Sequence, residues 1–200
     1  MGQGQRTEAQ NEQRDEAFRL ELETLIPHLR AFARTLCGDP TAADDLAQDA
    51  MLKAWDARAS FEMGTNMKAW TFMILRNQFY SEKRRSWRQS QLDQEAAERT
   101  LVAVDDPEAP VALDELRQGL AMLPAEQREA LILVGAGGFA YEEAAAICDC
   151  AVGTVKSRVS RARRALQGIL ESGAYRRDGS SAGEAMATIL ADAERLSQVK

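Results

Sequence analysis

Five basic side chains lie between residues 151 and 170, in a stretch that contains no acid. They are Lys156, Arg158, Arg161, Arg163 and Arg164. Arginine and lysine pair with phosphate oxygens and with the acceptor edge of guanine, so this set favours binding to nucleic acid. A second basic cluster occupies residues 76–88, whereas residues 93–115 hold eight acids against one arginine. The charge pattern therefore predicts two contacts with a polyanion, separated by a segment that avoids it.

The first basic cluster belongs to a pattern typical of a helix-turn-helix: a short helix over 141–147, a turn over 148–150 and a longer helix from 152. One face of the longer helix is apolar: Val152, Val155, Val159, Ala162 and Leu166. The other face is polar or basic: Thr154, Lys156, Ser157, Ser160, Arg161 and Arg164. We expect the first face to pack and the second to meet phosphates and base edges. The alternative is that this basic face contacts only solvent. It is the weaker interpretation, because the helix directly follows a turn and a short helix of small residues, as in a helix-turn-helix.

The chain has 200 residues, 45% apolar and 28% charged, with a net charge of −6. From Phe18 to Trp87 the apolar residues recur at helical spacing, and strictly alternating strand patterns are absent. Gly38 and Asp39 or Thr41 predict a helix end followed by a capped helix, and Pro124 is placed at the first position of another. The sequence predicts an all-α fold: two small helical domains joined by an acidic linker.

Several other motifs are weak candidates for chemistry. Cys148 and Cys150 supply too few ligands for a structural zinc, and His28 has no visible nucleophile to serve. The glycines of 135–138 lack the Lys-Ser/Thr ending of a phosphate loop. We therefore predict no enzyme, no metal and no cofactor. The absence of a long apolar segment or a signal-peptide core favours the cytoplasm, and the three cysteines do not form a disulfide framework.

Both halves of the chain resemble one protein family. The sequence "LPAEQREALILVGAGGFAYEEAAAICDCAVGTVKSRVSRARRAL" resembles region 4 of bacterial RNA polymerase sigma factors of the extracytoplasmic-function (ECF) group. The segments "AADDLAQDAMLKAWDA" and "NMKAWTFMILRNQFYSEKRR" resemble region 2 of the same group. Within this group, the sequence of the region 4 segment most resembles the alphaproteobacterial general stress response subgroup. The resemblance covers roughly residues 20–90 and 110–170.

This resemblance implies an organisation and a set of partners. Residues 15–92 would be region 2, 93–110 an acidic linker, 111–171 region 4, and 172–200 a tail with a possible helix. The implied partners are RNA polymerase core, bound at the clamp helices of its beta-prime subunit, promoter DNA, and a small anti-sigma protein that clasps both regions. Neither a membrane nor a small-molecule substrate is implied. The polymerase would meet an acidic helix face formed by Asp44, Asp45, Gln48 and Asp49, for which a merely solubilising role is the alternative.

The resemblance also assigns the DNA contacts. The −35 element would be contacted by Thr154, Lys156, Ser157, Ser160 and Arg161, with Arg158 and Arg164 as phosphate or supporting contacts. The −10 element would be melted and held by Phe61, Asn66, Asn77, Tyr80, Lys83, Arg84 and Trp87, a mixture of aromatic, amide and basic groups that suits single-stranded bases. Loop 60–66 would form part of a pocket for a flipped −10 base. Trp70 and Phe72 are more simply interpreted as core residues.

Two residues depart from the family pattern without touching the predicted DNA face. Ala140 stands where a serine commonly caps the helix, leaving Glu143 as half of a capping box. Asp149 stands in the turn where relatives often have glycine, and we expect it to tolerate the left-handed conformation. Two rival functions remain open at this stage. They are a sigma-like decoy that sequesters an anti-sigma factor, and a stand-alone helix-turn-helix regulator that would leave the first 90 residues unexplained.

Overall fold

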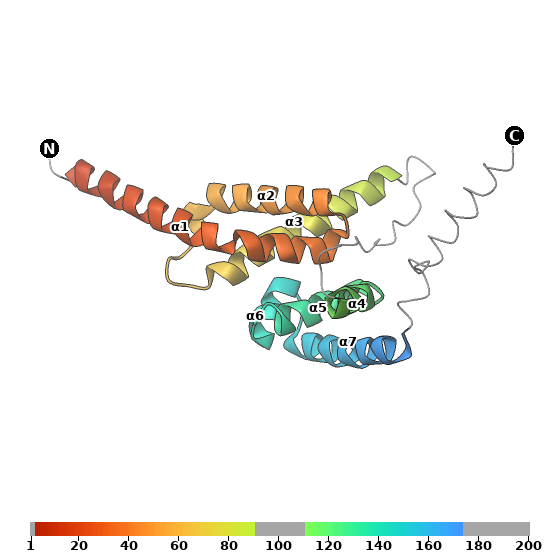
Figure 1. Ribbon diagram of the computed structural model, residues 1–200. Helices are drawn as coiled ribbons and strands as arrows, with labels where there is room; N and C mark the ends of the chain where they lie inside the picture. Colours follow the sequence, from red (N-terminus) through yellow and green to blue (C-terminus); the bar gives the residue numbers. More distant parts are fainter. Residues whose placement is uncertain (1–2, 91–110, 174–200) are drawn as a thin grey trace, which may run out of the picture.

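The computed structural model describes residues 3–90 and 111–173, with side chains for 10–87 and 115–173. Within these ranges the regular elements are all helices, without strands, and the helices form two packed bundles (Figure 1). The predicted acidic linker and the tail with its possible helix lie outside the described residues.

The first bundle consists of α1 (Gln3–Cys37), α2 (Pro40–Asp56) and α3 (Met67–Ser90), with a short 3₁₀ turn, η1 (Arg58–Ser60), after α2. Gly38 ends α1 with a φ of +72°, and Asp39 caps α2 by accepting from the amide of Ala42 at 2.7 Å. The bundle buries one apolar stripe from each helix, including Leu29, Ala47 and Leu75. The predicted helix end and cap are therefore confirmed.

The second bundle consists of α4 (Val111–Ala121), α5 (Ala125–Gly135), α6 (Tyr141–Cys148) and α7 (Val152–Ser172). Pro124 precedes the first residue of α5 rather than occupying it, one position earlier than the sequence predicts. Helices α6 and α7 form the predicted helix-turn-helix, and α7 packs on α5 and α4. Val155, Val159 and Ala162 are buried along the packed side of α7.

The two bundles pack directly against each other, with α3 against α6 and α1 against α5 (Figure 1). Phe72 of α3 stacks on Phe32 inside the first bundle, at a centroid distance of 4.7 Å. Its other neighbour is Phe139, which precedes α6, at a centroid distance of 5.0 Å in an edge-on arrangement. Because these rings join the two bundles, the buried apolar residues form one continuous core.

Candidate nucleic-acid interface

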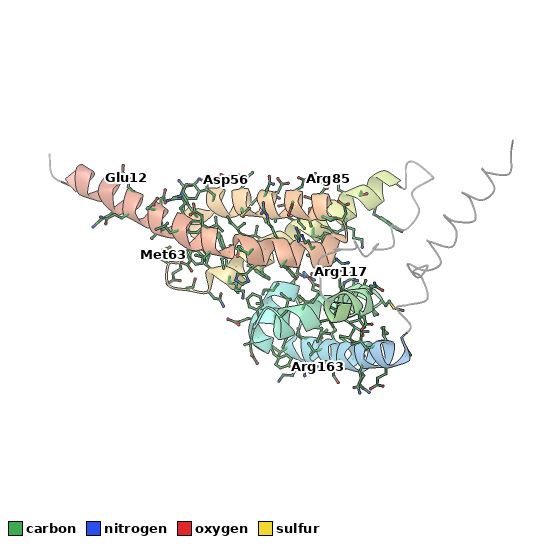
Figure 2. All side chains as sticks on the ribbon, in the orientation of Figure 1. Glu12, Asp56, Met63, Arg85, Arg117 and Arg163 are labelled. Atoms are coloured by element: carbon green, nitrogen blue, oxygen red, sulfur yellow. The ribbon has the colours of Figure 1, made fainter. Side chains whose placement is uncertain are left out.

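The polar face of α7 points away from both bundles. Lys156, Ser157, Ser160, Arg161 and Arg164 are all exposed, and Thr154 is half-buried. Figure 2 labels Arg163 on this outer side of α7, away from α1–α3. The same helix is apolar where it packs and basic where it meets solvent, which is the arrangement that a helix entering the major groove requires.

Two arginines of α7 make side-chain contacts of different kinds. The Arg161 guanidinium donates to the Ser157 hydroxyl at 3.1 Å, one turn earlier on the exposed face. Arg158 differs from its neighbours because its side chain is only 16% exposed and pairs with Glu126 of α5 at 2.5 Å. Its other donor reaches the Cys150 sulfur at 3.7 Å. In this structure Arg158 therefore braces α7 against α5 and the turn rather than facing solvent.

The turn between α6 and α7 depends on a left-handed residue. Asp149 has a φ of +51°, and among the described residues it is the single non-glycine with a positive φ. Aspartate tolerates this region better than most side chains, so α6 ends here without a glycine. The predicted tolerance of Asp149 is confirmed.

Helix α6 begins with half of a capping box. The Ala140 amide donates to the Glu143 carboxylate at 2.8 Å, whereas the alanine side chain offers no acceptor in return. Ala140 is exposed and its extended backbone, with φ −61° and ψ 158°, suits a capping serine. We expect Ala140→Ser to stabilise the fold by about 1 kcal/mol. Thermal unfolding followed by circular dichroism should show a higher Tm, whereas Ala146→Ser, at an exposed position inside α6, should not raise it.

The −10 residues predicted on α3 fall into two groups. Asn77, Lys83, Arg84 and Trp87 are exposed, and Trp87 retains 66% of its surface. Tyr80 is instead turned toward the second bundle, where its hydroxyl lies 3.2 Å from the Glu129 carboxylate. The second bundle therefore engages Tyr80 and leaves the other predicted −10 residues of α3 exposed.

The predicted −10 loop has buried ends and an exposed tip. Phe61 is 3% exposed and packs against Phe18 and Trp70, with centroid distances of 5.7 Å and 5.0 Å. Asn66 begins α3 by accepting from the Ala69 amide at 2.9 Å, and its own amide group donates to Glu143 at 2.6 Å. Residues 62–65 are exposed (Figure 2, Met63). The Phe61 ring belongs to the core in this arrangement, and the −10 contact expected of this residue stays a prediction.

An ion pair joins the two bundles, and the sequence analysis missed it. Glu129 of α5 is fully buried, and it accepts from Arg76 of α3 at 2.7 Å. The Arg76 guanidinium also lies over the Tyr80 ring, 4.6 Å from its centroid. Beside this pair Lys68 donates to the Gly137 carbonyl at 2.8 Å. An acid on the otherwise apolar face of α5, one turn before Leu133, was the signal in the sequence.

The electrostatics of this cluster keep the Arg76 guanidinium charged and the Tyr80 phenol protonated. Burial acts to lower the pKa of Arg76, but the charge and the hydrogen bond of Glu129 outweigh it, so the pKa is raised and the guanidinium stays charged. Burial, and then the charge of Glu129, raises the pKa of Tyr80 to about 12. The phenol is therefore protonated at neutral pH and can donate to Glu129.

The acidic face predicted on α2 lies on the surface of the first bundle. Asp45, Gln48 and Asp49 are exposed, whereas the Asp44 side chain is 37% exposed and lies 3.6 Å from Arg30. Asp49 accepts from the Gln78 amide of α3 at 2.9 Å. The second bundle packs on α1 and α3 rather than on this face. The α2 face is therefore open in this arrangement.

The two cysteines of the turn are structural in this arrangement. Cys148 is buried, and burial, followed by the charge of Glu129, raises the pKa of its thiol to about 12. Across residues 3–90 and 111–173, no group of three or more His, Cys, Asp or Glu side chains could hold a metal ion. None of the helices in these two ranges is long and apolar enough to cross a membrane.

Comparison with known proteins identifies both bundles. The family model described as Sigma-70 region 2 matches residues 22–89, and the model described as Sigma-70, region 4 matches residues 113–166. The ECF RNA polymerase sigma factor EcfG of Rhodopseudomonas palustris is 46% identical over 155 residues, which cover 78% of this chain and 86% of EcfG. The chain belongs to the family of ECF RNA polymerase sigma factors. The first bundle is its region 2 and the second its region 4.

Other relatives support the same assignment. The ECF sigma-E factor of Escherichia coli K12 is 36% identical over 135 residues, covering 61% of this chain and 70% of that protein. Among solved structures, the sigma factor RpoE of Bartonella quintana, in complex with the anti-sigma factor NepR, aligns with a TM-score of 0.70. It is 49% identical, over 78% of this chain and 98% of that chain. CnrH in complex with the cytosolic domain of CnrY aligns with a TM-score of 0.55 and 25% identity, over 80% and 94% of the two chains.

As an ECF sigma factor, the chain directs RNA polymerase core to promoters and initiates transcription through the −10 and −35 elements. The family models begin at residue 22, so they do not cover the first half of α1. There Arg14 and Asp15 contact Phe61, at the start of the predicted −10 loop, and Arg58 of η1. The sequence analysis did not single out these two residues, because polar groups on an exposed helix give no signal by spacing alone.

Proposed function

We propose that this sigma factor serves stress-response promoters, reading the −35 element with α7 and the −10 element with the 60–66 loop and α3. The single observation that carries the proposal is the two-sided α7. Its buried valines fix it against α5, and its lysine, serines and arginines face solvent together. The similarity to EcfG and to the RpoE that was solved with NepR supports a stress-response role.

The proposed contacts divide by the groups of the DNA that they would meet. Lys156 and Arg161 would pair with base edges in the major groove, and Thr154, Ser157, Ser160 and Arg164 would position the helix on the backbone. At the −10 element, exposed Asn77, Lys83, Arg84 and Trp87 would hold the displaced strand. Arg158 would act indirectly, through its pair with Glu126.

We further propose that the described packing is a closed state. Tyr80 and Asn66, two of the proposed −10 contacts, hydrogen-bond to region 4 through Glu129 and Glu143. A single-stranded base cannot take the same hydrogen-bonding positions while region 4 occupies them. Region 4 must therefore move away from α3 before the full −10 surface can bind DNA.

The acidic face of α2 is the proposed docking surface for polymerase core. It is open while the chain is closed, so docking on core can precede opening.

Replacing Asp45 and Asp49 by lysine should reverse the local charge and weaken binding to purified core by about tenfold or more, an effect that grows at low salt. Fluorescence titration of labelled protein with core measures this affinity. The matched variant replaces the exposed acids Glu21 and Glu23 of α1 by lysine. Equal weakening by both variants would contradict a specific docking face.

A small anti-sigma protein is the proposed regulator. RpoE of Bartonella quintana, the structural relative with 49% identity, was solved in complex with the anti-sigma factor NepR. A protein of this kind would bind regions 2 and 4 together and stabilise the closed state. Size-exclusion chromatography of the chain with a NepR-like protein tests the idea, and failure to form a complex would contradict it for that protein.

The remaining assignments follow from this function. We propose a cytoplasmic protein without enzymatic activity, with region 2 at residues 15–92, the linker at 93–110, region 4 at 111–171 and the tail at 172–200. The packing of Arg14 on the −10 loop extends the functional part of region 2 at least one residue further. The decoy alternative does not explain the exposed basic face of α7, and a stand-alone regulator does not explain α1–α3.

A further inference from the structure

The first half of α1 carries a polar cluster that does not serve the helix itself. The Arg14 guanidinium donates through one nitrogen to the Phe61 carbonyl at 2.8 Å, and the Arg58 and Ala59 carbonyls lie 3.3 Å and 3.4 Å from the same nitrogen. These carbonyls belong to η1 and to the start of the −10 loop. Arg14 is therefore attached to the backbone at the point where the loop leaves the bundle.

A second contact from α1 fixes the other side of this point. Asp15 accepts from the Arg58 guanidinium at 2.8 Å, and the same guanidinium donates to the Trp55 carbonyl at 3.1 Å. The Arg58 guanidinium also lies over the Trp55 ring, 4.5 Å from its centroid. Arg58 is thus held by α1 and by the end of α2. Adjacent residues of α1 contact both ends of η1.

The loop beyond this clamp has little else to hold its shape. Its exposed residues 62–65 are stabilised by their own turn, in which the Thr65 hydroxyl donates to the Glu62 carbonyl at 2.7 Å and Gly64 has a φ of +89°. One end of the loop is fixed by the burial of Phe61 and by Arg14, and the other by Asn66 at the start of α3. The angle at which the loop tip leaves the bundle depends on the end that Phe61 and Arg14 fix.

We propose that Arg14 is a positioning residue for −10 base discrimination, acting through the backbone of η1 and Phe61 to fix the exposed loop tip. The inference rests on the proposed reading of the −10 element by this loop. A pocket discriminates between bases only when its groups are held within a fraction of an ångström of the correct geometry. Releasing the clamp leaves the loop residues present and lets the tip move, so discrimination falls further than overall binding.

The test is initiation by reconstituted holoenzyme on two promoter sets, one varied only at single −10 positions and the other varied only at −35. For each set, the ratio of run-off product between the best and the worst promoter measures discrimination. Arg14→Ala should lower the −10 ratio by about fivefold or more and leave the −35 ratio unchanged. A merely structural role would lower the amount of product on every promoter and leave both ratios as they are.

Two further variants separate geometry from charge. Lysine keeps the charge of Arg14 but not its planar fork, so Arg14→Lys should also lose most of the −10 discrimination. Arg19→Ala is the matched control, because Arg19 lies on the same helix and, within the described part of the chain, its ion pairs are with Glu16 and Glu23 of that helix. It should retain the wild-type ratio. A wild-type −10 ratio in Arg14→Ala or Arg14→Lys, or an equal loss in Arg19→Ala, would overturn the proposal.

Failure of the underlying function would look different. If the unaltered protein showed no preference at any −10 position, the proposed reading of the −10 element by the loop would itself fail. If the unaltered protein discriminates and Arg14→Ala discriminates equally well, only the role of Arg14 fails.

Discussion

Replacing Lys156 and Arg161 together by alanine should reduce initiation at a promoter with its native −35 element by about 100-fold or more. Each well-formed contact between a basic side chain and a base edge contributes about 1–3 kcal/mol of discrimination, and each 1.4 kcal/mol corresponds to a factor of ten. Both residues are exposed and the packed face of α7 does not include them. The fold and the affinity for polymerase core should therefore be unchanged. Run-off transcription with reconstituted holoenzyme measures the effect.

The controls for this prediction concern charge and promoter. Arg19→Ala with Arg34→Ala removes the same two charges from exposed positions of α1, and its activity should stay close to that of the unaltered protein. On a promoter whose −35 element has been scrambled, the double variant of α7 and the unaltered protein should be equally weak. Full activity of the α7 variant on the native promoter would show that this face does not read the −35 element.

Replacing Glu129 by alanine should open the chain. The change would leave Arg76, whose side chain is 13% exposed, buried without its partner, and removing one member of a buried pair costs about 3–5 kcal/mol. Separation of the bundles lets the guanidinium return to water, so the cost should appear as loss of packing between regions 2 and 4. We expect a larger radius of gyration by small-angle scattering with an unchanged helical content by circular dichroism.

The titration of Tyr80 provides a spectroscopic test of this opening. Burial and the charge of Glu129 raise the pKa of Tyr80 to about 12. The substitution removes the charge, and separation of the bundles removes the burial. Ultraviolet titration should therefore show one tyrosine pKa falling toward 10 in Glu129→Ala. Glu126→Ala is the matched control on α5, since Glu126 pairs with Arg158 inside region 4. A compact Glu129→Ala protein with Tyr80 still titrating near 12 would contradict the role of this pair in closure.

Features determined by local sequence could be predicted, and features determined by packing between distant segments could not. The spacing of Val155, Val159 and Ala162 gave the orientation of α7, because a helix buries whichever stripe is apolar. Gly38 and Asp149 gave the ends of α1 and α6, because few residues adopt a positive φ without strain. These inferences needed only neighbouring residues.

The residues whose surroundings could not be predicted all make long-range contacts. Phe61 lies in a polar loop sequence, yet its ring reaches Phe18, more than 40 positions earlier, and is buried. The Arg76–Glu129 pair and the Arg14 clamp join segments about 50 residues apart, for which one sequence contains no spacing rule. The packing of region 4 on α3 was unpredictable for the same reason, since each bundle has its own apolar stripe.

The most direct test of the account is run-off transcription with purified polymerase core, this protein and a promoter library varied at the −35 and −10 elements. The account predicts initiation that requires both the protein and core, that selects a sequence at each element, and that loses only the −35 preference when Lys156 and Arg161 are replaced. Initiation without selection at either element, or no initiation from a chain that binds core, would contradict promoter recognition by these two surfaces.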